Sequence, residues 1–197
     1  MKRILQKFEN RTDLPIEIEE IRDFIVELGI QDRIIFCAED LDTVILRGVI
    51  YQWRQSSSVY GESIWTTLIV YPCSMAPDWQ RAICAKEMVH IFDSQIVKTV
   101  NPEMIEGLAK KVVGPLEIDA ESPESLMATV DRLAEFQAVN LLFPRAARTL
   151  ARNKISSNEM TVREISEWAS IPEHFVQIAL DPKWEDISSI LDSLSSS

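Results

Sequence analysis

The chain has 197 residues, 46% of them hydrophobic and 26% charged, a composition typical of a soluble globular protein with one domain or at most two. Its formal net charge of −11 argues against direct binding to nucleic acid and favours a basic or neutral protein as partner. The three cysteines have no C-x-x-C spacing, so neither a disulfide framework nor a cysteine zinc site is expected. No apolar run is long enough for a membrane span, and we expect a cytoplasmic location.

The first part of the chain predicts one helix followed by a small sheet. Apolar residues spaced three and four apart predict an amphipathic helix over residues 13–28, with Pro15 near its start and Gly29 just past its end. Runs of β-branched and aromatic residues then predict strands over residues 44–51 and 64–71, in a sheet of two or three strands.

The rest of the chain is predicted to be mainly helical. Pro72 and Pro77 break the chain, Asp78 can cap a helix that runs to about residue 95, and a long helical pattern from residue 122 stops near Pro144. The remaining expected elements are a helix over residues 102–112, an acidic loop over 114–123, and short helices at 145–152, 162–170 and 172–180.

Residues 86–90, Lys-Glu-Met-Val-His, differ at one position from the His-Glu-x-x-His helix that holds zinc in metallopeptidases. Residues four apart lie on one face of a helix, so that motif aims two imidazoles at one ion while the Glu acts as general base. Here Glu87 takes the general-base position and His90 that of the second ligand, but Lys86 replaces the first. An ordinary lysine is an ammonium without a free electron pair, so it repels a cation instead of binding it.

The same residues also have a plain structural interpretation. A Lys-Glu-x-x-His run arises readily by chance, and a lone histidine beside apolar residues is more often hydrogen-bonded and semi-buried than a metal ligand. Asp93, one turn after His90, either accepts a hydrogen bond from the imidazole or lies on the solvated face of the helix.

The order of these features resembles the ImmA/IrrE family, zinc peptidases that act on phage and stress-response repressors. The resemblance rests on the strand at residues 68–71, the helix at 78–90 and the segment 136–144, which ends in Leu-Leu-Phe-Pro, and it spans roughly residues 44–180.

The resemblance implies an α+β fold, a small, mostly antiparallel sheet packed on zincin-like helices. We expect this domain in residues 1–154 and a helical C-terminal extension in residues 155–197. Residues 161–180 have a helix-turn-helix rhythm, but residues 156–197 contain two basic and eight acidic residues, the wrong sign for DNA. These helices are therefore expected to pack on the rest of the chain or on a protein partner.

The family also supplies a carboxylate ligand eleven residues before the proline of its second motif, a position that is Leu133 here. Asp131 and Glu135 lie two residues to either side, rotated by about 200° on a helix, so either needs a change of register to act as a ligand. A catalytic zinc site needs about three protein ligands. We therefore expect no cofactor, with zinc held by His90 and one of these carboxylates as the alternative.

Lys86 suggests a sharper hypothesis, in which its ammonium lies where zinc would lie and pairs with Glu87, Asp131 or Glu135. In the opposite case, burial lowers the pKa of Lys86 strongly and leaves a free amine that serves as base or ligand.

The sequence therefore favours a degenerate zinc-peptidase-like protein without peptidase activity, acting as a protein-binding or regulatory module in a phage or stress-response setting. A repressor is the partner that the resemblance suggests. One alternative is an active metal-dependent peptidase that uses Glu87 and His90, and another is an unrelated soluble interaction protein.

Overall fold

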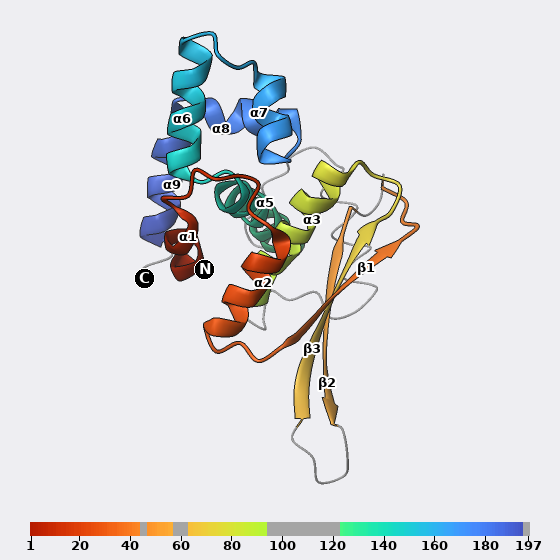
Figure 1. Ribbon diagram of the computed structural model, residues 1–197. Helices are drawn as coiled ribbons and strands as arrows, with labels where there is room; N and C mark the ends of the chain where they lie inside the picture. Colours follow the sequence, from red (N-terminus) through yellow and green to blue (C-terminus); the bar gives the residue numbers. More distant parts are fainter. Residues whose placement is uncertain (44–46, 57–62, 94–122, 195–197) are drawn as a thin grey trace.

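The computed structural model describes residues 1–43, 47–56, 63–93 and 123–194 (Figure 1). Its architecture is α+β, as predicted, with a small sheet at one side and helices packed against one face of it. The helix expected at residues 102–112 lies outside the described residues, as do the end of the helix expected to reach residue 95 and the loop expected at 114–123 except Pro123, which is helical.

Two helices precede the sheet, α1 (Lys2–Phe8) and α2 (Ile18–Glu27). The predicted amphipathic helix is confirmed as α2, which buries Ile18, Ile21 and Ile25 and is followed by Gly29 with a positive φ. It begins at Ile18 instead of near residue 13, because Glu17 still has extended backbone angles. Helix α1 was not predicted, although Ile4 and Phe8, four residues apart, are both buried.

The sheet consists of β1 (Arg33–Glu39), β2 (Val49–Ser56) and β3 (Ser63–Pro72) in the order β1-β3-β2. It is mixed instead of mostly antiparallel as expected, because β1 runs parallel to β3 while β2 runs antiparallel to it. The second predicted strand is confirmed as β3, and the first begins later and extends further, as β2. Strand β1 was missed because its apolar run of five residues does not alternate with polar residues.

The two faces of the sheet have different surroundings. Side chains alternate between the faces along a strand, and cross-strand partners share a face. Ile69 of β3 is fully buried, and its partners Phe36 and Ile50 pack against the core on the helical side. Tyr51 and Ile64 lie on the opposite face by this alternation, and both are exposed.

Helix α3 (Pro77–Val89) lies between the sheet and α5 (Pro123–Leu142), and it contacts both. Its N-cap is Ala76 instead of the expected Asp78, so the helix begins at Pro77, whose fixed φ suits the first turn, and it continues into the 3₁₀ turn η1 (His90–Phe92). Helix α5 ends two residues before Pro144, as the sequence predicts. Their contact places residues 86–90 opposite the middle of α5.

The chain ends in a group of short helices, α6 (Arg145–Ser156), α7 (Val162–Ala169), α8 (Glu173–Leu180) and α9 (Lys183–Leu194). The first three were predicted, and α9 was not. As expected, they pack on the rest of the chain: the ring centroid of Trp79 in α3 lies 5.3 Å from that of Phe175 in α8. The boundary expected between residues 154 and 155 falls inside α6, and the helices after it share the same buried core.

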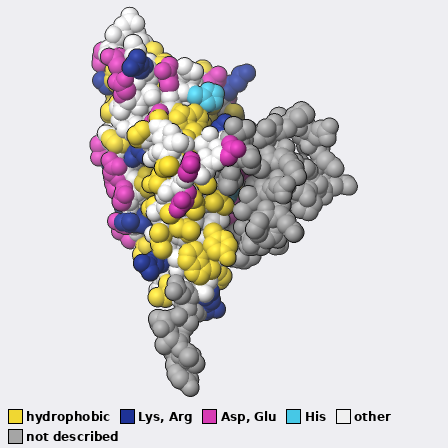
Figure 2. All heavy atoms as spheres, turned by 90° about the vertical axis from the view of Figure 1, so that its right-hand side faces the viewer, with side chains coloured by type: hydrophobic (Ala, Val, Ile, Leu, Met, Phe, Trp, Pro, Cys, Tyr) yellow, Lys and Arg dark blue, Asp and Glu magenta, His cyan; other side chains and the backbone are white. Residues whose placement is uncertain are grey.

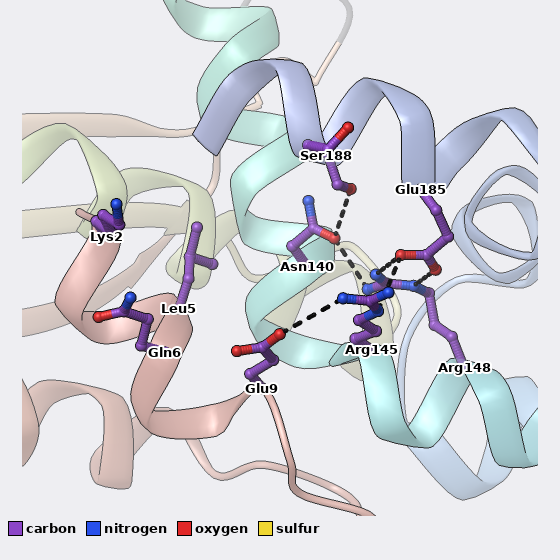
Figure 3. A pocket seen from close by; sticks show the side chains of 10 residues that line it. Lys2, Leu5, Gln6, Glu9, Asn140, Arg145, Arg148, Glu185 and Ser188 are labelled. Atoms are coloured by element: carbon purple, nitrogen blue, oxygen red, sulfur yellow. Dashed lines mark hydrogen bonds and ion pairs between the residues drawn. The ribbon is translucent and has the colours of Figure 1, made fainter. Parts of the chain in front are cut away.

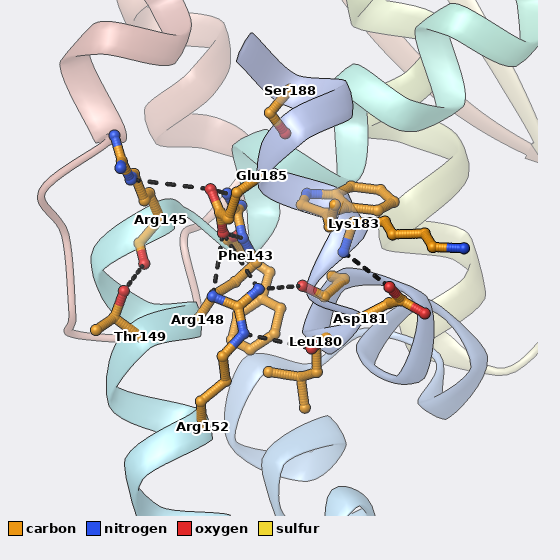
Figure 4. A network of polar contacts seen from close by, with 12 residues as sticks. Phe143, Arg145, Arg148, Thr149, Arg152, Leu180, Asp181, Lys183, Glu185 and Ser188 are labelled. Atoms are coloured by element: carbon orange, nitrogen blue, oxygen red, sulfur yellow. Dashed lines mark hydrogen bonds and ion pairs between the residues drawn. The ribbon is translucent and has the colours of Figure 1, made fainter.

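A buried arginine joins α5, α6 and α9 (Figure 4). Arg148 is 2% exposed, and its guanidinium donates to both carboxylate oxygens of Glu185 at 3.1 and 3.2 Å. It also donates to Asn140 Oδ1 at 2.9 Å and to the carbonyl of Phe143 at 2.6 Å. Arg152 donates to the same Glu185 carboxylate. A buried charge is costly unless it is paired and hydrogen-bonded, and this one is both.

Within the ranges that the structure describes, no helix combines the length and the apolar character that crossing a membrane requires.

Candidate functional site

The residues singled out in the sequence meet where the end of α3 faces α5. Lys86 comes from the last turn of α3, His90 opens η1, and Asp131 projects from α5. Their side chains are 17%, 13% and 22% exposed, so the site is largely but not fully closed to solvent.

Lys86 forms the centre of the cluster. Its Nζ lies 2.5 Å from Asp131 Oδ1, to which it donates a hydrogen bond, and 3.1 Å from Glu87 Oε1. The predicted pairing of this ammonium with Glu87 and Asp131 is therefore confirmed. Glu135, the third candidate, is not among the ion-pair partners of Lys86 in the part of the chain that the structure describes.

His90 lies between two carboxylates. Its Nδ1 is 2.6 Å from Asp93 Oδ2, and its Nε2 is 3.4 Å from the same Asp131 oxygen that binds Lys86. Burial by itself lowers the pKa of His90, but the contacts with Asp131 and Asp93 outweigh it and raise the pKa to about 9. Of the two interpretations of Asp93, the structure thus shows the contact with the imidazole.

Lys86 and Asp131 also shift each other's pKa values toward the charged forms. Burial opposes the ammonium, but the neighbouring carboxylates Glu87 and Asp131 raise the pKa of Lys86 above its ordinary value. Burial likewise opposes the Asp131 carboxylate, yet contacts with His90 and Lys86 hold its pKa well below the usual range. The hypothesis of a free Lys86 amine is therefore wrong, because the buried lysine has carboxylates beside it.

The site position expected on α5 is wrong. The expected register places Leu133 toward the site and turns Asp131 away, whereas Asp131 is the residue that reaches Lys86 and His90. The packing of the two helices explains this, because Ala134 and Ala138 are the small, buried residues of α5. Residues 131, 134 and 138 follow helical spacing, so the face of α5 that carries these alanines also carries Asp131.

Glu87 is closed off on the side of the sheet. Its residue is 3% exposed, and Oε1 has no hydrogen-bond partner in the described structure, because the 3.1 Å contact with Lys86 Nζ lacks hydrogen-bond geometry. Gly48, just before β2, passes directly over it. A Cβ atom at Gly48 would lie 3.0 Å from Glu87 Oε1 and 2.5 Å from Ile83 Cγ2, so only glycine permits this approach.

The donor set does not fit zinc. Among the described residues, no group of three or more His, Cys, Asp or Glu side chains is arranged to hold a metal ion. His90, with a pKa of about 9, is an imidazolium at neutral pH, and a protonated ring nitrogen has no electron pair for a metal. The third group is the ammonium of Lys86, which donates to Asp131, one of the two carboxylates in contact with His90. A catalytic zinc site needs about three unprotonated ligands and an open position.

The imidazolium of His90 makes stability depend on pH. Because the folded pKa is about 9 and the ordinary value is 6.5, its stabilisation is complete below pH 6.5 and is lost as the pH rises through 9. Relative to His90→Gln, which does not titrate, the free energy of unfolding should fall by up to about 3 kcal/mol over that range. Urea denaturation at about pH 6 and about pH 9.5 measures this difference. Parallel declines in the two proteins would contradict it.

Comparisons with protein-family models, with curated proteins and with solved structures gave no match. The resemblance to the ImmA/IrrE family therefore stays a hypothesis that rests on the sequence motifs alone. The geometry around Lys86 is an observation on the chain itself.

Proposed function

We propose that this chain is a degenerate zinc-peptidase-like protein that lacks peptidase activity and acts as a protein-binding or regulatory module. The observation that carries the proposal is the 2.5 Å contact between Lys86 Nζ and Asp131 Oδ1. It puts a fixed ammonium beside the histidine and the carboxylate that a metal would otherwise join. The charge of a metal ion is thereby replaced by that of a side chain.

The alternative of an active metal-dependent peptidase requires Glu87 to activate a metal-bound water and His90 to be a ligand. Both side chains are in the region that the motif predicts, but neither is available for these tasks. His90 is held between Asp93 and Asp131 in its charged form, and Glu87 is covered by the backbone at Gly48. We derive no hydrolytic step from this arrangement.

A binding role has separate support in the surface of the sheet. Tyr51 and Ile64, which share the face of the sheet opposite the helices, are 51% and 53% exposed, and Figure 2 shows hydrophobic side chains gathered on the side of the molecule that carries the sheet. Exposed apolar patches of this kind often mark contacts with other proteins. The net charge of −11 favours a neutral or basic partner, and the motif resemblance suggests a repressor of a phage or stress-response system.

Metal content tests the first half of the proposal. Protein purified without chelator or metal-affinity tag, together with His90→Ala, is analysed by mass spectrometry for bound metal. We expect no stoichiometric zinc in either protein and no peptidase activity after zinc is added. Stoichiometric zinc in the wild type that is lost in His90→Ala would overturn the proposal and restore the peptidase alternative.

Partner capture tests the second half. A Tyr51→Ser and Ile64→Ser double variant changes two exposed side chains on one face of the sheet and leaves the Lys86 cluster intact. A specific partner should be retained by the wild type and by a matched Val26→Ser variant on α2, whose side chain is also exposed, and lost with the double variant. Equal retention by all three would rule out this face as the binding surface.

A further inference from the structure

A polar pocket that shares no residue with the Lys86 cluster lies where α1 meets α5, α6 and α9 (Figure 3). Its volume is about 380 Å³, near the lower end of the roughly 300–1,000 Å³ found for small-molecule sites. The lining contains the cations Lys2, Arg145 and Arg148 and the carboxylates Glu9 and Glu185. A pocket with so polar a lining suits a small, polar ligand.

Asn140 is held in one orientation at the wall of this pocket. Its Oδ1 accepts hydrogen bonds from Arg148 Nη1 and Trp184 Nε1, both at 2.9 Å, and from Ser188 Oγ at 3.3 Å. Arginine and the tryptophan indole can only donate, so the atom facing them must be the amide oxygen. The NH₂ group of Asn140 therefore points away from this network, and no hydrogen bond from it is found among the described residues.

The carboxylates at the pocket form no short contact with the guanidinium of Arg145. Glu185 is already hydrogen-bonded by Arg148 and Arg152. Arg145 is 66% exposed, and its nearest carboxylate contacts are 3.9 Å to Glu9 and 3.8 Å to Glu185, too long for hydrogen bonds. Its N–H groups can thus turn to a ligand without breaking a short contact.

The local charge is positive in a strongly acidic protein. Lys2, Arg145 and Arg148 outnumber Glu9 and Glu185 by one charge in the lining of the pocket, whereas the whole chain carries −11. Arginine forks bind carboxylate and phosphate oxygens in a planar, two-point fashion, and an amide NH₂ adds a further donor.

We propose that this pocket binds an oxyanion group, the phosphate or carboxylate of a small molecule, through Asn140 Nδ2 and Arg145, with Lys2 supplying further positive charge. The ligand's oxygens would accept from the donors that the Arg148–Glu185 network leaves unused. This site does not depend on the proposed function at Lys86, and either can fail without the other.

The indole of Trp184 reports directly on this site. The chain has five tryptophans, and the N–H of Trp184 donates to the side chain of Asn140, which lines the pocket. The full-length protein, labelled with ¹⁵N, is titrated with sodium phosphate and separately with sodium acetate, with chloride keeping the ionic strength constant. We expect the Trp184 indole resonance to shift saturably while the other four stay in place. A response to phosphate alone assigns a phosphate group, and any response to acetate assigns a carboxylate.

Two variants and a control make this test specific. Asn140→Asp keeps an acceptor for Arg148, Trp184 and Ser188 but replaces the NH₂ donor with a carboxylate oxygen, so binding should weaken at least about tenfold. Arg145→Ala should weaken it similarly, whereas Arg163→Ala, which removes an arginine that is 80% exposed on α7, should leave it unchanged. The proposal is overturned if neither anion shifts Trp184 saturably, or if Arg145→Ala and Arg163→Ala bind equally well.

Discussion

The Lys86→His variant is expected to bind one zinc ion per chain, at least about a hundredfold more tightly than the wild type. The substitution removes the ammonium that binds Asp131 and restores an imidazole four residues before His90, on the same face of the helix. His90 Nε2 already lies 3.4 Å from Asp131 Oδ1, so the new imidazole completes a set of three donors on one side of the α3–α5 contact. Zinc binding would displace the proton from His90.

Metal content after zinc loading and dialysis measures this gain. Lys86→Met is the matched control, because it removes the charge and keeps a long side chain without adding an imidazole. A second control combines Lys86→His with Asp131→Asn, which removes the carboxylate ligand. If Lys86→His binds zinc no more strongly than Lys86→Met does, the cluster is not a metal site that differs from a working one at a single ligand.

The part of this site that lies on a single helix could be predicted from the sequence. Helical spacing alone brings Lys86 and His90 together, and the opposite charge of nearby carboxylates suggested the ion pair that the structure shows. The partner on α5 was harder, because it depends on how two helices pack. The counted distance from Pro144 pointed to Leu133, while the buried alanines at 134 and 138 gave the true facing side. That signal was present in the sequence but was not used.

The elements of the fold that local spacing determines could likewise be predicted, and those that depend on distant contacts could not. Helix α2 was predicted because its isoleucines repeat at helical spacing, and β3 because it is a long β-branched run. Strand β1 is short and lies at the edge of the sheet, and its identity depends on pairing with β3, thirty residues later. The Arg148–Glu185 pair likewise joins helices far apart in the chain. The only local sign of this pair in the sequence is that Arg145, Arg148 and Arg152 are spaced three and four residues apart. Such a row of arginines is usually the solvated face of a helix, so it does not predict a buried ion pair.

Asp131→Asn is expected to be the most destabilising single change in the cluster, lowering the free energy of unfolding at neutral pH by about 3 kcal/mol. Asp131 Oδ1 contacts both Lys86 and His90, and its loss leaves two buried cations to share the remaining carboxylates. Lys86 would keep only the Glu87 contact, which lacks hydrogen-bond geometry. Urea denaturation of the variant and the wild type gives the difference directly.

Glu135→Gln is the matched control for this measurement, because Glu135 lies one turn further along α5 and makes no ion pair with Lys86 in the described structure. It should change stability by less than about 0.5 kcal/mol. Adding Lys86→Met to Asp131→Asn should recover much of the loss, since an apolar replacement of a buried pair is often neutral while a broken pair is not. If the double variant were no more stable than Asp131→Asn, the stability lost in Asp131→Asn would come from the lost contact with His90. The Lys86 ammonium would then not be the main charge that Asp131 stabilises. Recovery would instead mean that the pair adds little net stability and serves to fix α3 against α5.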